Sequence, residues 1–309
     1  MQNGRNFLAC KAAGREEQAA DVRSFAAEGS LPLRHTGGHH SSSKVVKQLM
    51  YGKGLFAEPG RWLLGSCTIA ALALAWFAAT DWLALLGPLQ LPSPADTYDS
   101  LLQLLGPGYA DETLAQHMLA SMELVLTGFA AAAITGLPLG LVMGLSRPAN
   151  FFFNGIFQII RPIAPIAWIP LTILWFGLGT TAKVFVIWLA AFAPVVINTQ
   201  TGVRNVEPVL IAAARVHGAL GWTILFDIVI PGALPTIFTG LRISLQACWM
   251  VLVAAELVGS FAGLGHIMII ATRDLNPGMI VVAMTGVAML GVLLTAVLSF
   301  LERQVTPWR

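Results

Sequence analysis

Charged side chains are scarce in this sequence. Asp, Glu, Lys and Arg make up 11% of its 309 residues, whereas a soluble domain carries about 25%. Hydrophobic residues make up 56%, and the net charge of +2 gives no indication of a nucleic-acid partner. A shortage of charge on this scale disfavours a soluble protein and predicts an all-α integral membrane protein.

The residue patterns of catalytic and cofactor sites are also missing. Cys10, Cys67 and Cys248 are scattered, which excludes a disulfide framework and a cysteine metal site. The sequence has no G-x-x-x-x-G-K-[ST] loop for nucleotide phosphates. A formal G-x-G-x-x-A at 177–182 lies between two apolar stretches and not in a strand–turn–helix unit, so it does not indicate a dinucleotide site. We therefore expect that this chain is not an enzyme and holds no cofactor or metal.

The first 60 residues differ from the rest of the chain. They are rich in Gly, Ser, Ala and charge, and Lys and Arg outnumber the acids. No apolar core follows the basic start, so the segment is not a secretory signal. Residues 1–60 are predicted to form a disordered cytoplasmic tail, and residues 61–309 a membrane domain.

About six apolar stretches in the membrane domain reach the length of roughly 20 residues that spans a bilayer. They are 62–79, 119–145, 151–178, 182–200, 233–257 and 279–301. No Lys or Arg occurs between Trp62 and Ser146, so the first loop is expected outside and both termini in the cytoplasm. Lys183 departs from this charge asymmetry, because it falls on a predicted outer turn.

Two of the predicted spans have internal features. Glycines four residues apart line one face of the second span and predict close packing against another helix of the same chain: Gly136, Gly140 and Gly144. Prolines interrupt the third span: Pro162, Pro165 and Pro170. Broken backbone at membrane depth is tolerated only where protein or a water-filled cavity covers it. The third span is therefore predicted to be a broken helix.

The predicted cytoplasmic segment 201–231 contains a short helix. Glu207 suits the positive end of a helix, Pro208 suits an early helical position, and Gly218 is a typical stop. The small residues Ala212, Ala213 and Ala214 make this helix thin enough to enter a groove on another protein. An interfacial helix lying on the bilayer explains the same pattern equally well.

The segment resembles the signature loop of ABC-importer permeases. Ala213 and Ala214 match its alanines, Gly218 its glycine, and Ile228, Ile230 and Pro231 its Ile-x-Leu-Pro end. Ala212 departs from the family pattern, which has glutamate there. Residues 61–309 also resemble the nitrate/sulfonate/taurine branch, and especially the taurine and alkanesulfonate permeases. Four runs carry this resemblance, with LPSP and TPWR near the two ends: GLPLGLVMGLS, RPIAPIAWIPLTILWFGLG, FAPVVINTQTGV and TGLRISLQACWMVLVAAELVG.

The resemblance implies a type I ABC-importer permease in a bacterial inner membrane. In such an importer two permease copies form the pore, cytoplasmic ATPase subunits bind ATP and Mg²⁺, and an external binding protein delivers the substrate. The expected ATPase-coupling residues are Glu207, Ala212, Ala213, Ala214, Arg215, Gly218, Ile228 and Pro231. The expected substrate is taurine, another alkanesulfonate or a similar small organic anion.

Charged and polar residues within the spans mark the candidate translocation path, because burying them in a membrane is costly. The candidates are Arg161, Arg242, Gln246, Trp249 and Glu256. Helix-end snorkelling and ion pairing between spans are the favoured explanation of the charged members.

Three alternatives compete with this interpretation. The same importer class transports nitrate, bicarbonate, aromatic acids or thiamine precursors. A stand-alone secondary transporter would show matched broken helices in two inverted repeats, and the prolines of the third span have no such match. A membrane enzyme would need a cluster of catalytic side chains, but His217 and His266 fall on opposite sides of the predicted membrane.

Overall fold

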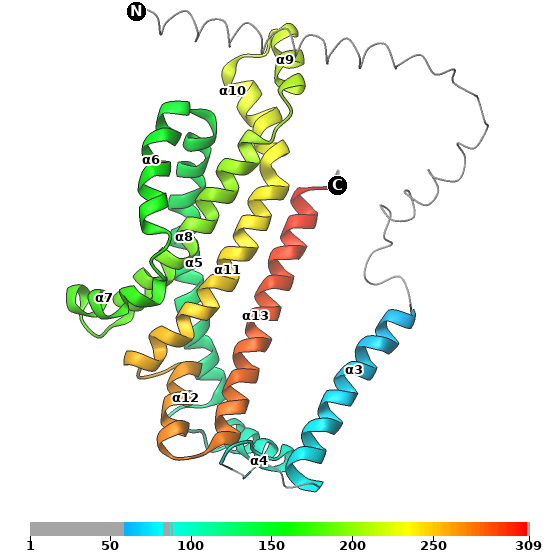
Figure 1. Ribbon diagram of the computed structural model, residues 1–309, viewed down its shortest axis with the longest axis vertical. Coiled ribbons are helices and arrows are strands. Elements are labelled where there is room, and N and C mark those ends of the chain that lie inside the picture. Colours follow the sequence, from blue (N-terminus) through cyan, green and yellow to red (C-terminus); the bar gives the residue numbers. More distant parts are fainter. Residues whose placement is uncertain (1–58, 83–86, 88, 308–309) are drawn as a thin grey trace, which may run out of the picture. The chain divides into compact units, whose positions relative to one another are not determined.

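The computed structural model describes residues 59–82, 87 and 89–307 (Figure 1). The predicted tail therefore lies almost entirely outside the described residues. The chain divides into two units between Ile69 and Ala70, and apart from the start of the first helix every described element belongs to the second unit. Every secondary-structure element assigned in the described part of the chain is a helix, as predicted.

The described helices lie at the predicted spans and in the segments that connect them. They are α3 (Pro59–Phe77), α4 (Pro94–Leu105), α5 (Leu114–Leu145), α6 (Arg147–Ile160), α7 (Ile169–Phe176), α8 (Thr180–Arg204), α9 (Pro208–Val216), α10 (Gly221–Ile224), α11 (Ile230–Gly259), α12 (Leu264–Arg273) and α13 (Pro277–Val305). Short π-helical segments follow α3 (Ala78–Trp82) and join α10 to α11 (Leu225–Val229), and a 3₁₀ turn (Pro165–Trp168) precedes α7.

Four of these helices are long and apolar enough to cross a membrane on their own. They are α5, α8, α13 and the continuous segment Gly221–Gly259, which contains α10 and α11. Helices α6 and α7 make a fifth, broken span that bends by 80°. This break confirms the prediction for the third span. Helix α3, with 19 residues, stands at the position of the first predicted span.

The fifth span begins earlier than predicted. The sequence placed its start at about residue 233, after Pro231. Pro231 does lie in the first turn of α11, where a missing N–H leaves no intrahelical bond unmade. However, the π-helical turn Leu225–Val229 carries the helix back to Gly221, so the segment has 39 residues. The predicted cytoplasmic segment and the fifth span are thus joined by continuous helix.

Glycines allow the core helices α5 and α8 to approach closely. A Cβ added at Gly136 would lie 2.9 Å from a Val195 methyl, and one at Gly140 would lie 2.6 Å from Thr199 Cβ. The same contact repeats at Gly144, 2.6 Å from Val203 Cβ. The predicted glycine face therefore packs within the chain, as expected.

Helix α8 also packs along α11, and Figure 1 shows α5, α8 and α11 running side by side. A Cβ at Gly202 of α8 would lie 3.0 Å from the Ala233 carbonyl oxygen of α11. Helices α9 and α10 lie at one end of this bundle, and α4 and α12 lie at the other (Figure 1). The short helices α9 and α12 are therefore separated by the length of α11.

Candidate coupling and transport site

Helix α9 is closed at both ends by its local sequence. Glu207 is the N-cap residue and Pro208 the first helical residue, so the helix starts one residue later than predicted. At the other end the Ala219 N–H donates to the Ala214 carbonyl (3.0 Å) and the Gly218 N–H to the Arg215 carbonyl (3.0 Å). These two bonds form a Schellman motif, which needs a left-handed residue after the C-cap. Gly218 meets this need with φ of +80°.

The surface of α9 is open. Not one of its residues is buried, and Val209 and Val216 are 73% and 86% exposed. Trp222, which is also exposed, stacks on Phe226 with ring centroids 5.9 Å apart. Apolar side chains exposed together mark a surface that another molecule covers. We call this set the α9 patch: Val209, Leu210, Val216, Leu220, Trp222 and Phe226.

A small apolar cluster fixes the base of this open segment. Val203 and Val206 before α9 pack with Val229, Ala233 and Ile237 after it. The cluster joins the end of α8 to the start of α11. A force applied to α9 therefore reaches both α8 and α11.

The structure divides the predicted coupling residues into two groups. Glu207, Ala212, Ala213, Arg215 and Gly218 are exposed on α9 or at its ends. The remaining three are partly buried: Ala214 within α9, and Ile228 and Pro231 at the base of the segment. Their contact with an ATPase stays a prediction.

The predicted translocation residues do not gather on one surface. Arg161 is exposed at the end of α6, where the broken span bends, and Gln246 is exposed on α11. Trp249 and Glu256 are only 7% and 0% exposed. Arg242 is partly exposed and forms an ion pair with Glu302 of α13. The assignment of these residues to a path stays a prediction.

Sequence reasoning missed Glu302, the partner of Arg242. The two residues lie 60 positions apart, and the only signal for the pair is that Arg242 is the only basic residue within one predicted span and Glu302 directly follows another. A polar hollow of about 480 Å³ opens beside them and is lined by Arg242, Ser299, Glu302, Arg303, Thr306 and Pro307. Within the described residues the buried Nε of Arg242 has no hydrogen-bond partner.

Comparison with known proteins identifies the class. Residues 136–309 match the family described as "Binding-protein-dependent transport system inner membrane component". The chain belongs to this family. It is the membrane permease subunit of an ABC importer, a multi-pass inner-membrane protein and not itself the ATPase.

Several curated permeases are similar to this chain over most of its length. The taurine transport system permease protein TauC of Escherichia coli is 39% identical over 78% of this chain and 88% of its own. The bicarbonate transport system permease protein CmpB of Synechococcus elongatus is 35% identical, with coverage of 78% and 88%. The nitrate import permease protein NrtB of Synechocystis is 34% identical, with coverage of 70% and 81%. These relatives confirm the predicted nitrate/sulfonate/taurine branch.

Solved structures confirm the type I permease fold. Two crystal forms of the MetNI methionine ABC transporter, in inward facing conformations, each contain a chain that is 22% identical to this one. The TM-scores are 0.50 and 0.51, and each match covers 63% of this chain and 94% of that chain. At this identity the match supports the fold alone.

At the end of the permease opposite α9, side chains from other helices hold the start of α12. The first four N–H groups of a helix have no intrahelical acceptor, and α12 begins after Gly263, which has no side chain to cap it. Three consecutive N–H groups find acceptors elsewhere: Gly263 on His117 Nδ1 (3.0 Å), Leu264 on Ser121 Oγ (2.9 Å) and Gly265 on Glu256 Oε2 (2.8 Å). We call His117, Ser121 and Glu256 the α12 cap.

The α12 cap is internally satisfied. The Ser121 hydroxyl donates to Glu256 Oε1 at 2.7 Å. Because the Gly263 N–H donates to His117 Nδ1, this nitrogen carries no proton, and His117 Nε2 is the donor to the Tyr109 carbonyl at 3.0 Å. His117, Ser121 and Glu256 are all 0% exposed. Sequence analysis singled out Glu256 but missed its partners, whose only signal is polarity within an apolar stretch.

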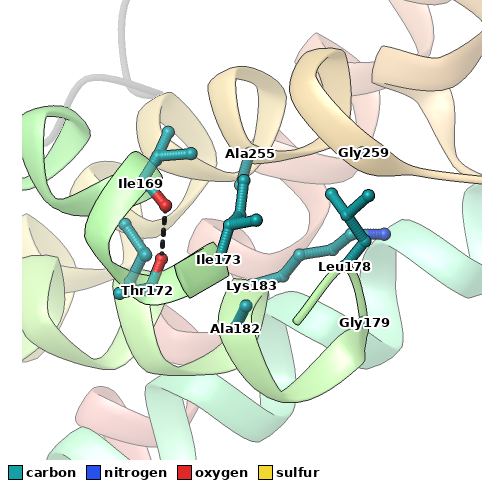
Figure 2. A pocket seen from close by; sticks show the side chains of 10 residues that line it. Ile169, Thr172, Ile173, Leu178, Gly179, Ala182, Lys183, Ala255 and Gly259 are labelled. Carbon is teal, nitrogen blue, oxygen red and sulfur yellow. Dashed lines mark hydrogen bonds between the residues drawn. The ribbon is translucent and has the colours of Figure 1, made fainter. Parts of the chain in front are cut away.

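Lys183 lies beside this network. Its Nζ donates to Ser260 Oγ at 2.9 Å. Burial disfavours the charge of Lys183, and the charge of Glu256 partly offsets this cost. Figure 2 shows the Lys183 side chain running past Leu178 along a narrow, mainly apolar pocket between α7, α8 and the end of α11. A half-buried, partnered ammonium explains why this cation is tolerated on the predicted outer side.

Two strained turns are joined next to the α12 cap. Ala110, Asp111 and Leu275 have positive φ values of 53°, 68° and 53°, which non-glycine residues rarely adopt. The Tyr109 hydroxyl donates to Asp274 Oδ2 at 2.5 Å and links the turns. Burial, the hydrogen bond to Asp274 and the charge of Asp274 all raise the pKa of the Tyr109 phenol above its usual range. The phenol therefore stays protonated and keeps donating.

Proposed function

We propose that this permease transports a small organic anion, with taurine or another alkanesulfonate as the first candidate. The higher identity to the taurine permease supports this choice over bicarbonate and nitrate. The margin is small, so bicarbonate and nitrate form the second candidate class. In this proposal an external binding protein selects the substrate and the permease provides the route.

The mechanism we propose is mechanical. A cytoplasmic ATPase binds ATP and Mg²⁺, and its groove receives α9. Two copies of the permease enclose the path, and both termini of each copy lie in the cytoplasm. The open surface of α9 is the observation that carries this proposal, because an exposed apolar patch on a rigidly anchored helix is what a tight partner contact needs. Closing of the ATPase then biases the permease between two states, which is the coupling of two sites.

Within this proposal an anion meets Arg161, Gln246 and Arg242 along the path. Arg161 and Gln246 are exposed in this conformation, and Arg242 becomes available when an anion competes with Glu302 for its guanidinium. Trp249 and Glu256 are buried on the side of α11 that packs against the protein, so in this proposal they hold α11 in place. Arg242→Gln should slow uptake without changing ATPase assembly.

The substitution Gly218→Asp tests the coupling role of α9. A Cβ at Gly218 meets no atom within 4 Å, so the change acts on the Schellman turn by adding a carboxylate and a left-handed strain of at most about 1 to 2 kcal/mol. We expect normal membrane insertion but loss of the ATPase subunit on purification, together with loss of transport. Gly179→Asp, at the N-cap of α8 and away from the α9 patch, is the matched control, because a Cβ at Gly179 also meets nothing within 4 Å and Gly179 has no positive φ. Uptake at the wild-type rate by Gly218→Asp would refute the coupling role.

The substrate is tested by uptake into vesicles that contain the permease, its ATPase and its binding protein. Labelled taurine, nitrate and bicarbonate are compared at equal concentrations. We expect taurine to be accumulated in an ATP-dependent way and to be displaced by other alkanesulfonates. Accumulation of nitrate or bicarbonate without taurine would select the second candidate class and leave the importer mechanism intact.

A further inference from the structure

The α12 cap has a construction that ordinary helix packing does not require. Gly263 has φ of +121°, and a Cβ there would lie 2.6 Å from the carboxyl carbon of Glu256. A Cβ at Gly265 would lie 2.7 Å from Glu256 Cβ. Two glycines thus let the backbone close around one carboxylate. The fit is specific to Glu256 and to the start of α12.

A carboxylate buried in this way is stable only when its oxygens are bonded. A buried charge without partners is strongly destabilising, because the protein interior does not replace the hydration that the charge has lost. In the cap both oxygens of Glu256 accept hydrogen bonds, one from Ser121 on α5 and one from the Gly265 N–H on α12. Separating α12 from α11 would leave Glu256 Oε2 and the Gly265 N–H without their hydrogen-bond partners. The two helices are therefore locked at this point.

The other end of the locked helix belongs to the coupling segment. Glu256 stands near the end of the continuous helical segment Gly221–Gly259, and the short turn 217–220 joins the start of this segment to α9. The 30 residues of α11 alone extend about 45 Å at 1.5 Å per residue. A helix that is packed along α8 and α5 moves as a rod, so displacement at Pro231 reaches Glu256.

Helix α8 is tied to the same place. Lys183, in the first turn of α8, reaches Ser260 directly after α11. The last turn of α8 meets the start of α11 in the cluster at the base of α9. Helices α8 and α11 are thus joined at both ends, and α12 is attached to this pair through Glu256.

We propose that Glu256 is a positioning residue that locks α12 to the rod formed by α11, so that movement of α9 is delivered to α12 at the opposite end of the permease. This inference rests on the proposed coupling role of α9 and extends it. In this proposal α12, with its partly exposed His266 and exposed Arg273, is the surface that moves when α9 moves.

The test uses the complete transporter, that is, the permease with its ATPase in lipid nanodiscs. Amide hydrogen exchange of residues 260–274 is measured without nucleotide and with ATP plus vanadate. In the wild type the exchange of this segment should change with nucleotide. Glu256→Leu has a similar size but no acceptor, so the Gly263–Gly265 amides should exchange about tenfold faster or more, and the response to nucleotide should disappear. ATPase co-purification and basal ATP hydrolysis should persist.

A conservative variant separates positioning from packing. The carbonyl oxygen of Glu256→Gln still accepts the Gly265 N–H, so this variant should recover most of the nucleotide response. Ser121→Ala removes the hydroxyl that donates to Glu256 of α11 and accepts from the Leu264 N–H of α12, but keeps the Glu256–Gly265 bond. It should give an intermediate response. If Glu256→Leu does not assemble, Ser121→Ala and Glu256→Gln carry the test, and the expected order of response is wild type, then Glu256→Gln, then Ser121→Ala.

Two controls define the outcomes that overturn the inference. Glu123→Gln changes an exposed carboxylate of α5 and should leave the response intact. Leu290→Ala opens the core in α13 and lowers stability without touching the cap. If Leu290→Ala abolishes the response as fully as Glu256→Leu, or if Glu256→Leu keeps the wild-type response, Glu256 is not the lock. A wild-type permease that retains no ATPase would instead refute the proposed function.

Discussion

Helices α9 and α12 are of similar length, with 9 and 10 residues, and each is joined to one end of α11. Their surroundings are opposite. Helix α9 makes its own ends and exposes every side except its base, whereas the start of α12 is held by side chains of α5 and α11. The proposed contact of α9 with a partner requires a free surface of this kind. A helix that must follow the core gives its backbone groups to the core.

The two glycines beside these helices show the same contrast. Gly218 ends α9 and Gly263 starts α12, and both have positive φ. A Cβ at Gly218 would meet nothing, whereas a Cβ at Gly263 would meet the Glu256 carboxyl group. At Gly218 the chain requires glycine only for its backbone conformation. At Gly263 it requires glycine for its conformation and for space.

Gly263→Ala should have the largest effect on stability of the substitutions that compare these two ends. Its φ and ψ of 121° and 166° are nearly restricted to glycine, and overpacking adds to this strain, for a total of about 3 kcal/mol or more. Gly218→Ala introduces only the left-handed strain of roughly 1 to 2 kcal/mol. Thermal unfolding of the two variants in the same detergent compares them directly. Equal losses would mean that the α12 cap is not tightly packed.

Tyr109→Phe should have a smaller effect at the same end of the permease. It removes the hydrogen bond between the two strained turns, and a bond of this kind contributes about 1 kcal/mol, since water replaces it at an exposed carboxylate. Hydrogen exchange should rise at residues 107–113 and 274–276 and should stay unchanged at α9. A rise that spreads into Gly263–Gly265 would show that the α12 cap depends on the Tyr109–Asp274 bond.

Local features of the fold were predictable because neighbouring residues determine them. The apolar runs fixed the helices, the glycines at 136, 140 and 144 predicted the contact with another helix, and the prolines predicted the break between α6 and α7. Pro208 and Gly218 placed the ends of α9 to within one residue. The predicted start of the fifth span was wrong. The π-helical turn Leu225–Val229 extends the helix beyond the expected boundary, back to Gly221.

The α12 cap could not be predicted, because it joins residues far apart in the chain. Ser121 and Glu256 are separated by 135 positions, and His117 and Gly263 by 146. Nothing in the local period of either span shows which polar residues will face each other. The pairing of Arg242 with Glu302 has the same cause. Sequence reasoning therefore found isolated charges and assigned them to a path, while packing supplied their partners.

Val216→Ser should have the smallest effect on stability and the clearest effect on assembly. Val216 is 86% exposed on α9, and substitutions at such surface positions usually change stability by no more than about 0.5 kcal/mol. If the α9 patch enters the ATPase groove, this variant loses buried apolar area there and should retain less ATPase on purification. Val292→Ser on α13, which is 71% exposed, is the matched control and should retain the wild-type amount. Equal retention by both variants would mean that the apolar surface of α9 is not what the ATPase holds.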